Sequence, residues 1–266
     1  MKIISFCDKR AYEPYKYLIK SAEKHDFLSK YEFILYTIGF KVEDPHPKVL
    51  YKEFPCTLAL TNPEHTRRIK PQILLQSLED FQDEDMLYID TDHLLGKRFN
   101  PKLLLNRTKS LLIPLAGYHC CNLDQGWKNS LLAKINTTLS TSYNFDYTQT
   151  NIVLYNLESR SFLLKWKKLC LDETYTKNLS FFNYAAGDEI VYNSILGMTN
   201  SNLNLGQIHI NIQAKGTCHF DVVDFSERME NHFNNKEIPE CRILNTSTIM
   251  FYHGGKNPEQ LKIYFN

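Results

Sequence analysis

The sequence predicts an α/β fold, built as an open, mostly parallel, twisted sheet with helices on both faces in a single domain. Two observations predict it. Short apolar runs alternate with stretches of helical apolar spacing from end to end, which is typical of a parallel sheet with crossover helices. The run Met86–Asp92 reads Met-Leu-Tyr-Ile-Asp-Thr-Asp, and a continuous apolar run of this kind indicates a strand buried on both faces.

The first half of the chain predicts strands and helices with clear boundaries. Lys2–Cys7 is apolar and β-prone, and the stretch after it places Tyr15, Leu18 and Ala22 at helical spacing. Pro71 opens a second helix, because proline is favoured at the first helical position. The predicted elements are strands Lys2–Cys7, Glu32–Gly39, Val49–Phe54, Met86–Asp92 and Ser110–Leu115, helices Ala11–Phe27 and Pro71–Phe81, and a short helix from Asn100.

The second half continues the alternation to the last strand. Apolar positions at helical spacing predict the helices, and short apolar runs predict the strands. The predicted elements are helices Trp127–Leu139, Ser159–Leu171 and Asp188–Leu196, and strands Asn151–Tyr155, Leu203–Ile212 and Ile243–Tyr252.

Length, composition and charge limit the class of protein. A chain of 266 residues can form one large domain that buries its core without disulfides. The apolar fraction of 43% and the charged fraction of 23% are ordinary, and 31 basic minus 30 acidic residues leave a net charge of +1. Broad binding to nucleic acids or anionic membranes needs a basic excess, so we do not expect it.

Targeting and cysteine signals predict a cytoplasmic protein. The first residues carry too short an apolar run for a signal peptide, and the longest apolar candidate, Leu103–Leu115, is too interrupted for a transmembrane helix. The seven cysteines include no Cys-x-x-Cys pair. We interpret them as reduced or buried thiols rather than a zinc site, although two of them follow His119.

Asp90 and Asp92 are the first candidate site residues. In parallel α/β sheets ligands bind beyond the carboxyl ends of the strands, and carboxylate oxygens suit Mg²⁺ or Mn²⁺. The alternative is a turn or a helix cap. Asp83-Glu84-Asp85 has the same spacing but follows a helix-like stretch, so we expect it to form a solvated turn.

The next candidates lie near the first strand and before the Pro71 helix. Asp8 follows the first strand, and it either caps the next helix or accepts hydrogen bonds from a nucleotide base. Tyr12 either stacks on that base or packs against the protein. The basic residues Arg67, Arg68 and Lys70 either neutralise a diphosphate or form a solvated face.

The last candidates lie near the end of the chain. Asp188 and Glu189 begin a predicted helix, where an acidic residue also interacts well with the helix macrodipole. His253 ends the last predicted strand and is followed by two glycines and Lys256. The imidazole suits a metal, the lysine suits phosphate, and the glycines allow close approach of an anion. The alternative for His253 is a structural histidine in a glycine turn.

The order of these signals resembles nucleotide-sugar-dependent glycosyltransferases of the GT-A fold, and it is most similar to the retaining group that includes glycogenin and bacterial lipopolysaccharide galactosyltransferases. The resemblance runs roughly from Lys2 to Pro258. It implies a Rossmann-like domain over residues 1–266, with a nucleotide-binding half at 1–115 and an acceptor-binding half at 116–266. It also implies transfer of a hexose, with retention, from UDP-Glc or UDP-Gal to a hydroxyl of a glycan, lipid or protein.

The resemblance implies a role for each metal and diphosphate candidate. Asp90-Thr91-Asp92 matches the Asp-x-Asp motif that holds Mn²⁺, or Mg²⁺, on the nucleotide diphosphate, with Thr91 beside the donor. His253 matches a late metal ligand and Lys256 a diphosphate contact.

The resemblance also implies how the nucleotide and its sugar are bound. Asp8 matches an aspartate that binds uracil, with Tyr12 near the stacking aromatic residue, and Lys70 or Arg67 matches a basic residue that reaches the nucleotide sugar.

Two further matches concern the donor sugar. Asp188 and Glu189 match a carboxylate pair close to that sugar. The family usually has Asn-Ala-Gly before the strand matched by Asn151–Tyr155, whereas this chain has Gln149-Thr150-Asn151. Asn151 thus replaces a glycine, and its extra atoms change the donor-sugar or acceptor pocket.

Two other functions share the architecture. A sugar nucleotidyltransferase usually carries a glycine-rich loop and a lysine after its first strand, but Cys7-Asp8-Lys9-Arg10 contains no glycine. A non-catalytic nucleotide-sugar-binding protein would be expected to lose the metal carboxylates, which this chain keeps. The sequence therefore favours a glycosyltransferase.

Overall fold

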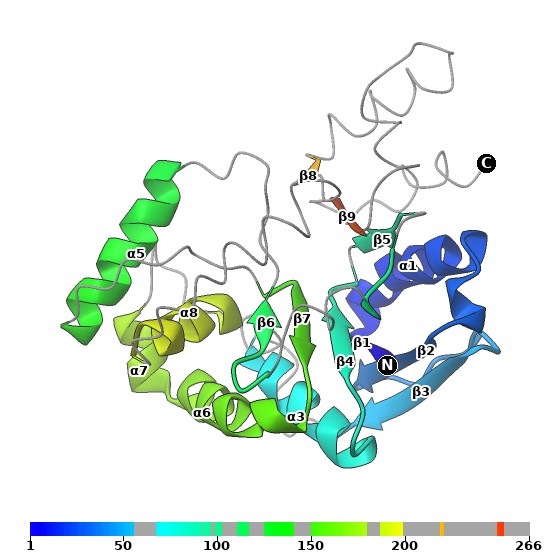
Figure 1. Cartoon of the computed structure of the whole chain (residues 1–266), viewed down its shortest axis with the longest axis horizontal. Coiled ribbons are helices and arrows are strands. Elements are labelled where there is room, and N and C mark those ends of the chain that lie inside the picture. Colours follow the sequence, from blue (N-terminus) through cyan, green and yellow to red (C-terminus); the bar gives the residue numbers. More distant parts are fainter. Residues whose placement is uncertain are drawn as a thin grey trace, which may run out of the picture.

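Two sheets and the helices around them make up the part of the chain that the computed structural model describes (Figure 1). The described residues are 1–55, 68–91, 93–96, 99–102, 111–116, 125–140, 150–179, 187–198, 219–220 and 249–252.

The larger sheet confirms the predicted open, mostly parallel arrangement. Its strands are β1 (Lys2–Cys7), β2 (Glu32–Ile38), β3 (Val49–Phe54), β4 (Met86–Ile89), β6 (Leu115–Ala116) and β7 (Ile152–Tyr155). They lie in the order β3-β2-β1-β4-β7-β6. Neighbouring strands from β3 to β4 are parallel, whereas β7 runs antiparallel to both β4 and β6. Because β7 is reversed, its first residues lie at the edge where β4 ends.

Helices cover both faces of this sheet. Between β1 and β2 lies α1 (Tyr12–Lys24), and between β3 and β4 lies α3 (Lys70–Asp80). The chain moves outward from β1 to β2 and later returns past β1 to β4, so right-handed connections place α1 and α3 on opposite faces. The other helices are α5 (Gln125–Leu139), α6 (Arg160–Leu171), α7 (Glu173–Asn178) and α8 (Asp188–Met198). Helix α6 packs between α3 and α8.

The smaller sheet contains three short strands in the order β5-β9-β8. They are β5 (His93–Leu95), β8 (His219–Phe220) and β9 (Ile249–Tyr252). β5 lies against α1, where the Ser21 hydroxyl accepts a 2.9 Å hydrogen bond from the Leu95 backbone N–H. Residues just after Asp90 are therefore tied both to the first helix and to the late strand β9.

The core explains why the strands read as continuous apolar runs. All four residues of β4 are buried, and six of the seven residues of β2 are buried. Both faces of these strands are covered by helices, so no alternation with polar residues is needed. Helix α3 begins with Lys70 and Pro71, and it buries Ile73, Leu74 and Leu78 against the sheet.

Two predicted elements are shorter in the structure, and one helix and two strands of the described structure were not predicted. The predicted strand Ser110–Leu115 is confined to Leu115–Ala116, because Pro114 lacks the N–H that strand pairing needs. Helix α1 ends at Lys24, since Asp26 has a left-handed backbone with φ of 56°. Helix α7, whose N-cap is Asp172, was not predicted, nor were the short strands β5 and β8.

Some predicted elements cannot be compared with the structure. The late strand Leu203–Ile212, and all but the last four residues of Ile243–Tyr252, lie outside the described residues. Within the described part of the chain, the helices are all too short or too polar to cross a membrane.

Asp80, at the end of α3, ties this helix to the outer strands. Its carboxylate accepts hydrogen bonds from the Tyr36 hydroxyl at 2.6 Å and the Gln76 amide at 3.1 Å, and it pairs with Lys52 at 3.0 Å. Burial by itself raises the pKa of Asp80, but these hydrogen bonds and the charge on Lys52 outweigh burial and lower the pKa below its usual 3.8.

We therefore expect Asp80→Asn to remove about 1–2 kcal/mol from the free energy of unfolding at pH 7. A carboxyl group with a lowered pKa stabilises the fold fully above its unfolded pKa, and this contribution is lost as the pH falls through the folded value. The difference between Asp80→Asn and wild type should thus shrink below about pH 4. Urea unfolding at several pH values measures it. Asp83→Asn, an exposed change of the same kind nearby, is the control; an equal, pH-independent loss in both variants would contradict this role.

Candidate active site

The site is built at the carboxyl end of β4, where Asp90 leaves the sheet. Backbone pairing of β1 with β4 stops at Tyr88, and the Ser5 hydroxyl on β1 then donates a 2.7 Å hydrogen bond to the Ile89 carbonyl. On the other side, the Asp90 N–H donates to the Asn151 carbonyl at 2.8 Å. Both contacts fix the backbone from which the Asp90 side chain projects, and they place Asn151 beside it.

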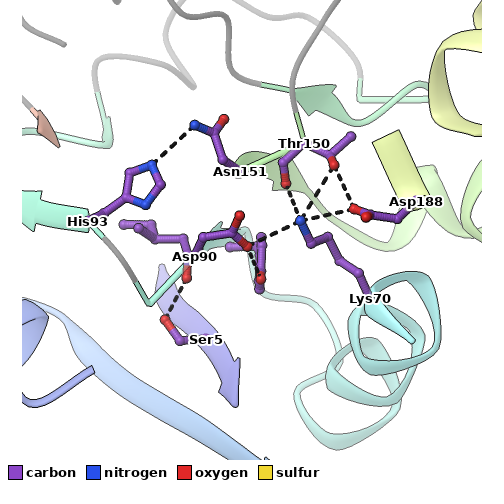
Figure 2. A network of polar contacts seen from close by, with 9 residues as sticks. Ser5, Lys70, Asp90, His93, Thr150, Asn151 and Asp188 are labelled. Atoms are coloured by element: carbon purple, nitrogen blue, oxygen red, sulfur yellow. Dashed lines mark hydrogen bonds and ion pairs between the residues drawn. The ribbon is translucent and has the colours of Figure 1, made fainter. Parts of the chain in front are cut away.

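Lys70 lies at the centre of a buried polar cluster (Figure 2). Its ammonium contacts Asp90 Oδ1 at 3.1 Å, Asp188 Oδ2 at 3.0 Å and the Thr150 carbonyl at 2.8 Å. The Lys70 side chain is 7% exposed, that of Asp188 is 11% exposed, and that of Asp90 is 30% exposed. The cluster therefore joins α3, the end of β4, the start of β7 and the start of α8.

Electrostatics keep Lys70 charged in this buried position. Burial is the largest effect and acts to lower the pKa of Lys70, but the attraction of Asp188 and then of Asp90 outweighs it and raises the pKa above its ordinary value. The ammonium also lies 4.9 Å from the centre of the Tyr88 ring, a favourable cation–π distance. A buried lysine with two carboxylate partners neutralises much of the charge that they would otherwise hold in the interior.

Asp188 is positioned by three contacts, which come from α6, from Thr150 before β7 and from α3. The Trp166 indole on α6 donates a 2.8 Å hydrogen bond to the Asp188 carbonyl, which fixes the start of α8. The Thr150 hydroxyl donates a 2.7 Å hydrogen bond to Asp188 Oδ2, the same oxygen that pairs with Lys70. Asp188 is thus held beside Lys70, whereas the side chain of Glu189, the other residue of the expected pair, is partly exposed.

Asn151 and His93 are in contact beside this cluster. The Asn151 amide nitrogen lies 3.2 Å from His93 Nε2, and both side chains are buried (Figure 2). His93 is the first residue of β5 and follows Asp92 directly. Asn151, which stands where the resembled family has a glycine, therefore contacts His93, two residues after Thr91. Thr91 is itself buried.

Asp8 and Tyr12 lie near the end of β1. The Asp8 carboxylate caps a 3₁₀ turn (Lys9–Ala11), accepting from the backbone N–H groups of Arg10 and Ala11, and it pairs with the Arg10 side chain. The Tyr12 ring packs edge-on against Phe40 at 5.5 Å. Asp8 thus makes the helix-cap interactions that the sequence offered as one alternative.

Four of the predicted site residues, Arg67, Asp92, His253 and Lys256, lie outside the described residues. Among the described ones, the structure brings Lys70, Asp90, Asn151 and Asp188 together at one edge of the sheet. Three groups of the site were not predicted from the sequence, namely Thr150, His93 and the Tyr88 hydroxyl. The Tyr88 hydroxyl donates a hydrogen bond to Asp90 Oδ1. The only signal for Thr150 was its place in a motif that departs from the resembled family.

Three solved structures share this architecture over nearly the whole chain. The galactosyltransferase LgtC, in complex with donor and acceptor sugar analogs, is 13% identical with a TM-score of 0.53, over 96% of this chain and 87% of that chain. An active-site mutant of LgtC is 15% identical with a TM-score of 0.53, over 96% and 88%. A glycosyltransferase involved in glycosylation of the major capsid of PBCV-1 is 10% identical with a TM-score of 0.50, over all of both chains.

The chain has the GT-A fold. No family model and no curated protein sequence matches it, so at these low identities the likeness is one of fold, and the chemistry has to be argued from the side chains.

Within this GT-A fold, Asp90 fits one part of a divalent-metal site. Its carboxylate is a hard oxygen ligand at the open edge of the sheet, 30% exposed, which suits Mg²⁺ or Mn²⁺. The described residues contain no group of three metal-ligating side chains, since the two other expected ligands lie outside them.

Proposed function

We propose that this GT-A chain is a metal-dependent glycosyltransferase that moves a hexose from a nucleotide sugar, UDP-Glc or UDP-Gal, to an acceptor hydroxyl with retention. The observation that carries the proposal is the Lys70 cluster, which gathers Asp90 and Asp188 at the open edge of the sheet. One of these carboxylates suits a metal–diphosphate site and the other suits the sugar. The acceptor would be a glycan, a lipid or a protein.

The reaction requires the nucleoside diphosphate to leave the donor sugar. Negative charge grows on the leaving phosphate, and fixed positive charge in a site shielded from water stabilises it. Lys70 is charged and buried beside the edge where this group would lie, and Lys256 and Arg67 would add to it. Asp90, Asp92 and His253 would hold Mn²⁺ or Mg²⁺, which neutralises the diphosphate as a Lewis acid.

The sugar becomes cationic as its bond to the diphosphate breaks. A nearby carboxylate stabilises an oxocarbenium-like sugar and orients its hydroxyls, as carboxylates do in glycoside hydrolysis. Asp188 is suited to this role because it is ionically paired, buried and held at the first turn of α8. Glu189, which follows Asp188, and Asn151, which follows Thr150, would complete the sugar site.

The nucleotide would extend from this cluster toward β1. β1 is the parallel neighbour of β4, so a base beside Asp8 and Tyr12 would lie along the same edge of the sheet as a diphosphate beside Asp90 and Thr91. Binding of uracil to Asp8 would require its side chain to exchange part of its pairing with Arg10.

Thermal unfolding with Mn²⁺ and a panel of UDP, GDP, CMP and their sugars tests the proposal. A ligand at 100 times its dissociation constant adds about 2.7 kcal/mol, which raises the midpoint of a domain this size by several degrees. We expect a shift with UDP and UDP-sugars that disappears when Mn²⁺ is chelated. No shift with any nucleotide would contradict the proposal.

Turnover separates the two rival functions. A glycosyltransferase releases UDP from a UDP-hexose in the presence of Mn²⁺, by slow hydrolysis or transfer to an added acceptor. A nucleotidyltransferase would instead join a sugar phosphate to a nucleoside triphosphate with release of pyrophosphate. A binding protein would show the thermal shift without any turnover.

A further inference from the structure

Thr150 makes two different contacts at the centre of the site. It precedes β7, it is 1% exposed, and its carbonyl accepts from the Lys70 ammonium while its hydroxyl donates to Asp188 (Figure 2). The side-chain contact is the shorter, at 2.7 Å, whereas the Thr150 hydroxyl oxygen lies 3.5 Å from Lys70. The hydroxyl therefore acts mainly on Asp188.

The hydrogen-bond donors of Lys70 are fully used. An ammonium has three N–H groups, and Asp90, Asp188 and the Thr150 carbonyl take one each, at 3.1, 3.0 and 2.8 Å. Lys70 can bind a diphosphate oxygen only by giving up one of these partners. If the partner given up is Asp188, the Thr150 hydroxyl is the bond that still holds Asp188 Oδ2.

One oxygen of the Asp188 carboxylate, Oδ2, binds the other residues of the cluster. Within the described residues, every contact to this carboxylate is made by Oδ2, which receives both Lys70 and the Thr150 hydroxyl. Oδ1 makes no hydrogen bond or ion pair with the described residues, so it is the oxygen that we assign to a ligand. The backbone of Asp188 is held separately by Trp166, so the Thr150 hydroxyl controls the orientation of the side chain and not the position of the helix.

We propose that Thr150 is a positioning residue that keeps Asp188 aimed at the donor sugar when Lys70 moves toward the diphosphate. The inference rests on the proposed glycosyltransferase function and deepens it. Of the two bonds to Oδ2, the one from Lys70 is exchangeable and the one from Thr150 persists. With Oδ2 held, Oδ1 accepts a hydrogen bond from a hydroxyl of the hexose.

Three substitutions at Thr150 test this role. Thr150→Val keeps the shape and the carbonyl but removes the hydroxyl, Thr150→Ala removes it without adding a methyl group, and Thr150→Ser keeps it. Loss of a hydrogen bond to a charged group that acts in the transition state lowers kcat by about 10- to 100-fold. We expect this loss in the valine and alanine variants, an almost unchanged KM for the donor, and a kcat near wild type for the serine variant.

A matched control comes from Thr176 on α7, which is also fully buried and bonds a backbone carbonyl through its hydroxyl. Thr176→Val should lower the unfolding midpoint but leave kcat unchanged. A wild-type kcat in Thr150→Val and Thr150→Ala, or an equally low kcat in Thr150→Ser, would overturn the role of Thr150. Failure of the proposed function is distinct, because the wild-type chain would then release no UDP from any nucleotide sugar.

Discussion

Lys70→Met is expected to lower the free energy of unfolding by about 3–5 kcal/mol, because it removes one partner from a buried ionic cluster. The substitution leaves the Asp90 and Asp188 carboxylates, both within 3.1 Å of the missing ammonium, without their shared countercharge. Methionine fills a similar volume, so the loss of unfolding free energy comes from the missing charge and not from a cavity. Urea unfolding at pH 7 measures it.

Two further variants serve as controls for the expected loss of stability. Lys16→Met removes an exposed lysine that pairs with Glu13, and surface pairs of this kind contribute about 0.2–1 kcal/mol. Lys70→Met combined with Asp188→Asn removes one of the stranded charges, so the double variant should be more stable than Lys70→Met alone. Equal losses in Lys70→Met and Lys16→Met, or no recovery in the double variant, would show that the cluster does not hold these elements together.

The same substitution should also abolish detectable transfer. Lys70 is the one described lysine that touches both Asp90 and Asp188. Without it, both the charge that stabilises the leaving group and the fixed distance between the two carboxylates are lost. UDP release from a UDP-hexose, measured at a temperature where Lys70→Met remains folded, separates this effect from unfolding.

Much of the fold could be predicted because a buried strand leaves a continuous apolar run in the sequence. Lys2–Cys7 and Met86–Ile89 were found within a few residues of their observed bounds, since these inner strands are largely buried on both faces. Val49–Phe54 was found as well, although it is an edge strand in which only the first and last residues are buried. The sequence failed where pairing is short or depends on distant partners. β5 has only three residues, and its pairing with Ile249–Tyr252 depends on residues more than 150 positions away. No local pattern reports such a contact.

The individual site residues were easier to predict than their arrangement. Asp90 and Asp188 were recognised from their places at a strand end and a helix start, and Lys70 from a basic cluster. That Lys70 would bridge the two carboxylates follows only from the return of the chain to β4 and from the reversed β7, which brings Thr150 to the same edge. The decoy Asp83-Glu84-Asp85 lies at the opposite end of β4. Only Asp83 is in an exposed turn, as predicted, whereas Glu84 and Asp85 are partly buried, and Asp85 accepts a hydrogen bond from Asn156.

Asp90→Asn is expected to lower turnover by about a thousandfold or more, because a carboxylate that holds a Lewis-acid metal and faces the leaving diphosphate cannot be replaced by a neutral amide. The shape of the residue is unchanged, and the amide oxygen can still accept the hydrogen bonds of Tyr88 and Lys70. Lys70 also keeps Asp188 as a partner, so the fold should lose little stability. The measurements are the rate of UDP release and the Mn²⁺ concentration at which this rate is half of its maximum.

Asp85→Asn is the matched control for this prediction, because it makes the same chemical change at the other end of the same strand. Asp85 accepts a hydrogen bond from Asn156 and lies before Met86, away from the carboxyl edge. We expect Asp85→Asn to keep wild-type turnover and the wild-type response to Mn²⁺, whereas Asp90→Asn should need more Mn²⁺ and remain slow at saturation. Full turnover and an unchanged Mn²⁺ response in Asp90→Asn would remove Asp90 from the metal site. The proposed function would then have to rest on a different carboxylate.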